Sequence, residues 1–187
     1  MSRLLSLVGA AAILFLYGCG GKEGGGAAPA KGQPVSDLVS EVTHVETRAD
    51  RAPNFSWRAA SGNEMNLDSL RGQVVFLNFW ATWCGPCQKE LPDLAELSRT
   101  YANRRVTFIG ASMDRGPNSM DDVRSFVQKA GLPYQNVIAS DDMAEAFGNV
   151  RLLPTSFLID GDGKISQTFI GIRSKDFYAN SIASLLK

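Results

Sequence analysis

Apolar positions follow two different patterns near the middle of the chain. Residues 74–80 are apolar at six of seven positions, which is the pattern of a strand buried on both faces. Residues 88–101 carry apolar side chains at helical spacing, which predicts an amphipathic helix with Leu91, Leu94, Ala95 and Leu97 on its inner face. Pro92 lies inside this helix and predicts a kink, because proline removes an interior hydrogen bond. The pattern therefore predicts a buried strand that leads directly into a helix.

The remaining pattern indicates the fold class. A hairpin with a glycine-containing turn is expected over residues 55–67, before the buried strand. After the central helix, short apolar and amphipathic segments alternate, which predicts strands at 106–111, 137–139, 155–159 and 164–170 and helices at 120–130, 142–147 and 175–186. This order predicts an α/β fold in which helices flank both faces of a mixed central sheet.

The first 19 residues have the pattern of an export signal. Arg3 gives a positive start, and residues 4–16 form an apolar run that is shorter than the ~20 residues of a membrane-spanning helix. Residues 16–19, Leu-Tyr-Gly-Cys, resemble the lipobox of bacterial lipoproteins and predict lipid attachment at Cys19. The alternatives are an ordinary cleaved signal with an unrelated cysteine, or a single membrane span.

Composition separates a tether from a folded domain. Residues 20–51 begin with a stretch rich in glycine, alanine and proline, which predicts a flexible linker. Within this linker, residues 37–51 fit either a docking strand or a short helix. We expect the folded domain to occupy residues 52–187. The whole chain is 44% hydrophobic with a net charge of zero, which fits a globular protein and gives no electrostatic basis for binding nucleic acid.

Cys84 and Cys87 are the main candidates for chemistry. They lie between the buried strand and the helix, where the unpaired N–H groups of a helix start favour a thiolate. A purely stabilising disulfide is a weaker interpretation, because closing so short a loop contributes only about 2 kcal/mol. A zinc site would need two more ligands, and the sequence has neither a second such pair nor two histidines. The pair therefore predicts redox chemistry without a metal or a cofactor.

Two motifs carry a resemblance to a known family. Residues 79–87, Phe-Trp-Ala-Thr-Trp-Cys-Gly-Pro-Cys, are similar to the active-site segment of thioredoxin-fold proteins. Residues 153–155, Leu-Pro-Thr, resemble the cis-proline loop of the same proteins. The N-terminal hairpin and the additional helix at 120–130 resemble the membrane-tethered TlpA/ResA branch, so the resemblance covers residues 52–187. It implies a thioredoxin-like fold with an N-terminal β-hairpin and an inserted central helix.

This resemblance implies a set of site residues. Cys84 would be the attacking thiolate and Cys87 the resolving thiol, an order that also suits an exposed helix end followed by a less accessible first turn. Pro154 would be cis and pack against the cysteine pair, although Leu152 stands where the family often has glycine. A substrate segment would pair with the backbone of Leu153. The implied substrate-binding residues are Trp83, Gly85, Pro86, Leu153 and Thr155.

Two polar positions bear on proton transfer. Asn78 stands at the strand position where cytoplasmic thioredoxins carry a buried acid, so that acid is absent. Glu90 lies one helical turn after Cys87 and matches an acidic position of the ResA-like branch, which implies a carboxylate that raises a thiol pKa or relays a proton. The alternative is a solvent-facing glutamate paired with a lysine. Asp114 fits either the active-site edge of the sheet or a solvated loop.

The implied function is extracytoplasmic thiol–disulfide exchange, with this protein as the reductant. Gly85-Pro86 is the pair found between the cysteines of reducing thioredoxins. By resemblance, the partners are disulfide-containing exported proteins, with apocytochrome c as one client, and a membrane thiol donor. The lipid anchor would leave the domain facing the periplasm or the outer side of the cytoplasmic membrane. The alternatives are a thiol peroxidase of the same fold and a non-catalytic peptide-binding lipoprotein.

Overall fold

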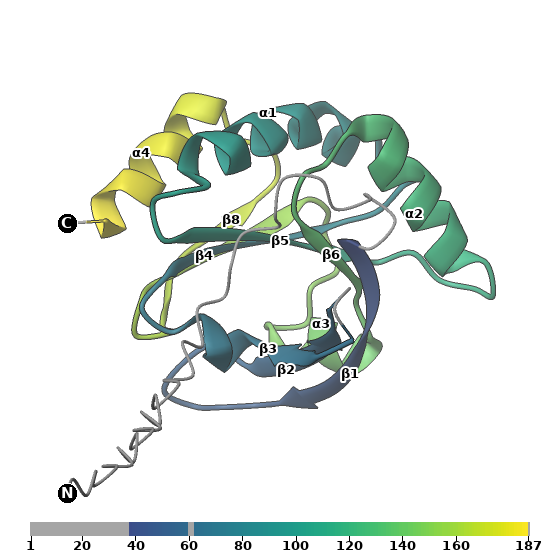
Figure 1. Cartoon of the computed structure of the whole chain (residues 1–187), viewed down its shortest axis with the longest axis horizontal. Coiled ribbons are helices and arrows are strands. Elements are labelled where there is room, and N and C mark those ends of the chain that lie inside the picture. Colours follow the sequence, from purple (N-terminus) through teal and green to yellow (C-terminus); the bar gives the residue numbers. More distant parts are fainter. Residues whose placement is uncertain (1–37, 60–61, 187) are drawn as a thin grey trace, which may run out of the picture.

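The computed structural model describes residues 38–59 and 62–186, in which three strands come first and strands and helices follow in mixed order (Figure 1). The predicted export signal, Cys19 and the start of the predicted tether lie outside these residues. The strands are β1 (Val39–Glu46), β2 (Asn54–Arg58), β3 (Glu64–Asn66), β4 (Val74–Trp80), β5 (Val106–Ser112), β6 (Gln135–Ile138), β7 (Thr155–Ile159) and β8 (Ile165–Ile170). The helices are α1 (Gly85–Tyr101), α2 (Ser119–Ala130), α3 (Asp141–Ala146) and α4 (Lys175–Leu185). No helix in the described ranges is long and apolar enough to cross a membrane.

Eight strands of the described ranges form one mixed sheet, in the order β3-β2-β1-β6-β5-β4-β7-β8. The strands β6, β5 and β4 run parallel, whereas β7 and β8 continue the sheet in antiparallel fashion. Parallel neighbours need crossover connections, and α1 and α2 provide them. The α/β class, the mixed sheet, the β2–β3 hairpin and the additional helix α2 are therefore as predicted.

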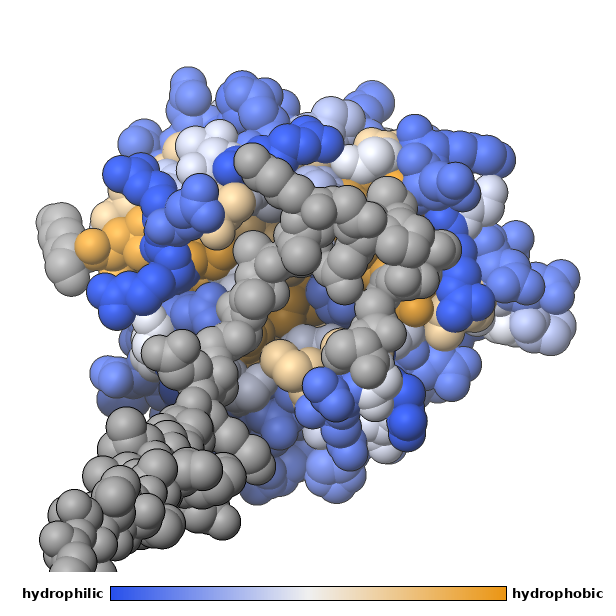
Figure 2. All heavy atoms as spheres, viewed as in Figure 1, coloured by the Kyte–Doolittle hydropathy of each residue, from blue (hydrophilic) through white to orange (hydrophobic). Residues whose placement is uncertain are grey.

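Strand β4 lies within this sheet and is buried along its whole length. On one face, Phe76 and Trp80 pack in a core beneath α1, α2 and α4. On the other face, Leu77 and Phe79 pack in a second core with the β2–β3 hairpin and α3. On the face that Figure 2 shows, hydrophobic residues are visible between the helices α1, α2 and α4 and the part that contains the hairpin and α3, and hydrophilic residues predominate around them. The double cover explains why residues 74–80 are almost continuously apolar.

Strand β1 corrects the predicted domain boundary. The prediction of a tether over residues 20–51 is wrong for β1, which lies inside the sheet between β2 and β6. Val39 is 4% exposed and pairs with Asn136, so the strand and not the helix is the correct alternative for this segment. Most side chains of β1 are exposed or half-buried, which leaves little hydrophobic pattern to detect. Backbone pairing with two neighbouring strands holds the segment in the sheet instead.

Helix α1 begins at Gly85, earlier than the predicted start at residue 88. The reason is local, because Cys84 takes an extended conformation and caps the helix with its sulfur. The helix then continues past Pro92 to Tyr101 as one element. The early start brings both cysteines to the first turn of the helix, where the site is built.

Candidate active site

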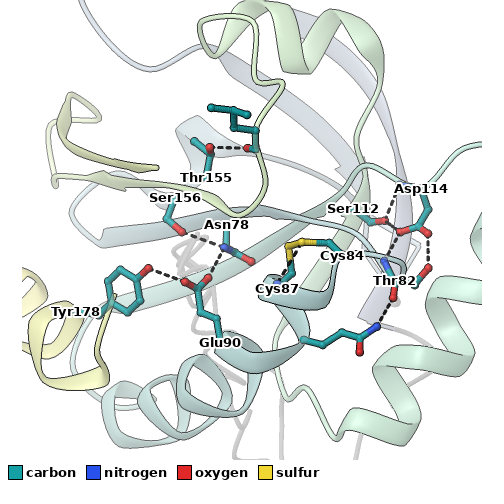
Figure 3. The surroundings of a disulfide bond; sticks show 12 residues. Asn78, Thr82, Cys84, Cys87, Glu90, Ser112, Asp114, Thr155, Ser156 and Tyr178 are labelled. Carbon is teal, nitrogen blue, oxygen red and sulfur yellow. Dashed lines mark hydrogen bonds between the residues drawn. A yellow bond between two sulfur atoms is a disulfide. The ribbon is translucent and has the colours of Figure 1, made fainter. Parts of the chain in front are cut away.

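The cysteine pair forms a disulfide at the junction of β4 and α1 (Figure 3). The two Sγ atoms are 2.06 Å apart and the two Cα atoms 5.2 Å apart. The sulfur of Cys84 also accepts a hydrogen bond from the backbone N–H of Cys87 at 3.2 Å. Pro86 occupies the first turn, where the N–H that it lacks has no helical partner. Once the bond is reduced, the N–H groups and the positive end of the helix dipole favour a thiolate at Cys84.

The two cysteines differ in exposure, in the order that we expected. Cys84 is 5% exposed and Cys87 only 1%. Cys84 is nevertheless much less exposed than expected of a solvent-facing residue, because in the disulfide form its side chain is largely covered. Trp83, next to it, is 69% exposed. Cys84 is therefore the more accessible of the two sulfurs, and the exposed indole ring of Trp83 comes directly before it in the chain.

Asp114 fixes the loop that precedes Cys84. Its carboxylate accepts hydrogen bonds from the backbone N–H of Thr82 at 2.9 Å, from the Thr82 hydroxyl, and from the Ser112 hydroxyl at 2.6 Å. The amide of Gln88 donates to the Thr82 carbonyl at 2.6 Å and closes the loop from the helix side. Asp114 is 5% exposed, so the solvated-loop alternative is wrong and this residue lies at the active-site edge of the sheet.

Glu90 is buried behind the cysteines, one turn after Cys87. Its side chain is 2% exposed, so the alternative of a solvent-facing glutamate paired with a lysine is wrong. Oε1 accepts a hydrogen bond from the Asn78 amide at 3.0 Å, and Oε2 accepts one from the Tyr178 hydroxyl at 2.7 Å (Figure 3). Burial raises the pKa of Glu90, and the hydrogen bonds from Tyr178 and Asn78 offset only part of that rise.

Asn78 connects this carboxylate to the neighbouring strand. Its amide nitrogen donates both to Glu90 and to the Ser156 hydroxyl, each at 3.0 Å. The pair forms because Asn78 and Ser156 lie opposite each other on β4 and β7. Ser156 and Tyr178 were not expected from the sequence as parts of the site. The proximity of Ser156 to Pro154 along the chain was a usable signal, whereas Tyr178 lies in the last helix with no local motif around it.

The cis-proline loop lies beside the cysteines, as the resemblance implied. The Leu153–Pro154 peptide bond is cis. Because β7 runs antiparallel to β4 with Thr155 opposite Phe79, this loop meets the end of β4 from which the active-site segment starts. Thr155 is buried and its hydroxyl donates to the Leu152 carbonyl at 2.7 Å, so its side chain shapes the loop from inside.

Several predicted docking residues are accessible around the disulfide. Trp83, Gly85 and Pro86 are exposed, and Leu153 is half-buried. Two features were not expected from the sequence. Leu152 is 64% exposed, and the backbone N–H of Gly171 donates to the Pro154 carbonyl at 2.8 Å. That bond brings the end of β8 and the segment after it to the loop, with two further exposed apolar side chains, Ile170 and Ile172.

Comparisons with known proteins identify relatives of this arrangement. Residues 49–168 match the AhpC/TSA family. A thiol-disulfide oxidoreductase ResA of Bacillus thuringiensis (strain Al Hakam) is 39% identical over 125 residues, which cover 67% of this chain and 70% of that protein. A thioredoxin-family thiol:disulfide interchange protein from Chlorobium tepidum TLS has a TM-score of 0.66 and 31% identity, over 76% of this chain and 99% of that one.

A second solved structure extends the comparison. The exposed lipoprotein thioredoxin of Streptococcus pneumoniae strain TIGR4 has a TM-score of 0.59 and 27% identity, over 71% of this chain and 99% of that one. The chain therefore belongs to the AhpC/TSA family of thioredoxin-fold proteins and, within it, to the ResA-like thiol–disulfide oxidoreductases.

Proposed function

We propose that this oxidoreductase is exported and reduces disulfide bonds of partner proteins through Cys84 and Cys87. The observation that carries the proposal is the cysteine pair at the start of α1, with Cys84 the more accessible of the two and the exposed Trp83 beside it. Gly85-Pro86 between the cysteines supports the reducing direction through its resemblance to reducing thioredoxins.

The chemistry proceeds in two exchange steps. The Cys84 thiolate attacks one sulfur of the partner disulfide, a mixed disulfide forms, and the first partner thiolate leaves and takes up a proton. Cys87 then loses its proton and attacks the Cys84 sulfur, which releases the second partner thiolate and closes the Cys84–Cys87 disulfide. Two electrons pass to the partner in one cycle. A dithiol donor must then reduce the pair again, and we propose a membrane thiol donor for this step.

Glu90 takes the proton of Cys87 in this scheme. Residues three apart on a helix lie on the same side, so the carboxylate and the Cys87 thiol share the inner face of α1. Cys87 is 1% exposed, so bulk water has little access to its proton. A buried carboxylate with a raised pKa is a stronger base than an exposed one and suits this transfer.

The partner segment docks around the disulfide. Trp83 offers an apolar ring, the exposed Gly85 and Pro86 leave space at the helix start, and the Leu153 backbone pairs with an extended segment. By resemblance to the TlpA/ResA branch, apocytochrome c is the client that we propose, and its haem-attachment motif holds two closely spaced cysteines. Cytochrome c maturation is thus the process that we propose for this activity.

Export and anchoring rest on the N-terminal sequence. The apolar run at residues 4–16 and the lipobox-like end at Cys19 support secretion and attachment of lipid. The relative from Streptococcus pneumoniae is itself described as an exposed lipoprotein. Replacing Cys19 by Ser should release the protein from the membrane fraction of an expressing bacterium. Retention of Cys19→Ser in the membrane fraction would contradict lipid anchoring.

The redox direction is tested by equilibrating the Cys84–Cys87 pair with thiol buffers of known potential. A reductant should have a potential close to that of thioredoxin, about −270 mV. A value at or above about −180 mV would contradict the reducing role and favour an oxidase or isomerase. Faster turnover of peroxide than of protein disulfides would favour the peroxidase alternative. Full function of Cys84→Ser in cells would favour peptide binding without catalysis.

A further inference from the structure

The hydroxyl of Tyr178 connects the C-terminal helix to the buried carboxylate behind the cysteines. Tyr178 is fully buried and lies 88 positions after Glu90 in the chain. Its hydroxyl donates to Glu90 Oε2 at 2.7 Å and accepts from the backbone N–H of Arg173 at 3.2 Å. A phenol has a single proton, and the N–H of Arg173 occupies the accepting side. The orientation of the hydroxyl toward Glu90 is therefore fixed by the segment that leads into α4.

The ring of Tyr178 is held as firmly as its hydroxyl. It packs edge-on against Phe76 of β4, with ring centroids 5.1 Å apart, and against Phe169 of β8 at 5.6 Å. The Ser174 side chain caps α4 just before this residue by accepting from the N–H of Phe177. These contacts restrict the movement of the Tyr178 hydroxyl away from Glu90.

The opposite oxygen of the carboxylate is held from the sheet. Asn78 of β4 donates to Glu90 Oε1, and the same amide nitrogen donates to the Ser156 hydroxyl of β7. Both carboxylate oxygens thus accept from neutral donors that belong to other elements of the fold. In Figure 3 the Asn78 amide and the Tyr178 ring approach Glu90 from two different sides. Hydrogen bonds therefore hold the Glu90 side chain at both carboxylate oxygens.

Charged neighbours do not hold the Glu90 carboxylate in place. None of the ion pairs in the described ranges involves Glu90. Asp93, on the same helix, raises its pKa further, and Arg173 contributes through its backbone. Tyr134, which comes before β6, is buried, and the negative charge of Glu90 helps to raise its pKa. Neutral hydrogen bonds are therefore the main interactions that favour the ionised carboxylate.

The arrangement of donors fits the ionised form of Glu90. The Asn78 amide nitrogen can only donate, and the Tyr178 proton already points to the carboxylate. Each oxygen keeps a second lone pair for an incoming proton, but a protonated oxygen accepts more weakly, so protonation would weaken one of these hydrogen bonds. We propose that Tyr178 is a positioning residue that, together with Asn78, fixes the buried Glu90 carboxylate and keeps it ionised beside Cys87. This inference rests on the proposed role of Glu90 in accepting the Cys87 proton.

Substituting Tyr178→Phe tests the inference, because it removes the hydroxyl and keeps the packed ring. The pKa of Glu90 is read from the side-chain carboxyl carbon by NMR in the oxidised full chain labelled on glutamate. Loss of a charge-assisted donor should raise this pKa by about one unit, a tenfold change in the ionisation equilibrium. Ser156→Ala, which removes the second partner of the Asn78 amide, should raise it by less and serves as the second variant.

Tyr101→Phe is the matched control. The Tyr101 hydroxyl also joins α1 to α4, by donating to the Ala179 carbonyl at 3.1 Å, and Tyr101 is 6% exposed. Its removal should leave the Glu90 pKa unchanged. An equal Glu90 pKa in wild type and Tyr178→Phe, or an equal rise in Tyr101→Phe, would overturn the inference.

A second measurement separates this inference from the proposed function. A mixed disulfide is formed at Cys84 with a small thiol, and its release by Cys87 is followed as a function of pH. The acid limb of this rate profile should move to higher pH in Tyr178→Phe by the same amount as the Glu90 pKa. A raised Glu90 pKa with an unmoved acid limb would support the positioning by Tyr178 and overturn the role of Glu90 as proton acceptor.

Discussion

Trp83 offers a direct test of where partner proteins dock. A tryptophan side chain presents about 200 Å², so an exposed fraction of 69% leaves about 140 Å² open to solvent. If a docked partner covers half of this, about 70 Å², then at about 25 cal/mol per Å² the contact contributes about 1.8 kcal/mol. Trp83→Ala should therefore weaken partner binding about 20-fold.

The assay compares two substrates of the reduced protein. One is a small disulfide, which reaches Cys84 without covering Trp83, and the other is a disulfide-bonded protein. Trp83→Ala should lower kcat/KM for the protein substrate about 20-fold and change the rate with the small disulfide less than threefold. Ile165→Ala is the control, because Ile165 is exposed at the end of β8 that lies away from the cis-proline loop. Equal losses on both substrates, or no loss on the protein, would refute docking on Trp83.

Three further predictions concern the buried carboxylates. Glu90→Gln should slow the Cys87-dependent release of a mixed disulfide by about a hundredfold, since it removes a general base. The same variant should also lose the pH dependence of stability that Glu90 gives the wild type. The raised pKa of Glu90 means that its stabilising contribution is complete only below its unfolded pKa and is lost as the pH rises through the folded pKa, so in denaturant unfolding the stability of Glu90→Gln relative to wild type should rise between about pH 4 and pH 7. Asp114→Asn should lower the free energy of unfolding by about 1–3 kcal/mol in the same assay, because an NH₂ group replaces an oxygen that accepts from Thr82. The control is Asp141→Asn at an exposed ion pair, which should change the free energy of unfolding by no more than about 0.5 kcal/mol. An unchanged release rate for the first variant, or equal costs for the two aspartates, would contradict these assignments.

The central strand and the cysteine pair were predictable because their signals are local. A continuous apolar run, two cysteines and a proline-containing helix start lie within residues 74–87. The burial of Glu90 also had a signal, since it lies three residues after Cys87 and one before Leu91, on the stripe that faces the core. Burial of a charge without a cation is costly, so the position on the stripe alone does not exclude a solvent-facing Glu90.

The parts that the sequence did not reveal depend on pairing between distant segments. Backbone hydrogen bonds to β2 and β6 hold strand β1 in the sheet, and such bonds do not require a particular pattern of side chains. The contact of Tyr178 with Glu90 joins the last helix to the first, and only the packing of α4 on α1 creates it. The burial of Asp114 likewise depends on the folding of the Thr82 loop over the end of β5. These are tertiary features, whereas the motifs of the chain are local.

The most direct test of the account is capture of the mixed disulfide on the Cys87→Ser variant. Without the resolving thiol, Cys84 should remain joined to its partner, and the adduct should accumulate and be released by dithiothreitol. Peptide mapping should place the bond on Cys84, and Cys84→Ser should form no such adduct. Adducts that form on Cys87 in the Cys84→Ser variant at the same yield, or no adduct on Cys87→Ser with any disulfide-bonded protein, would contradict the assignment of Cys84 as the attacking residue.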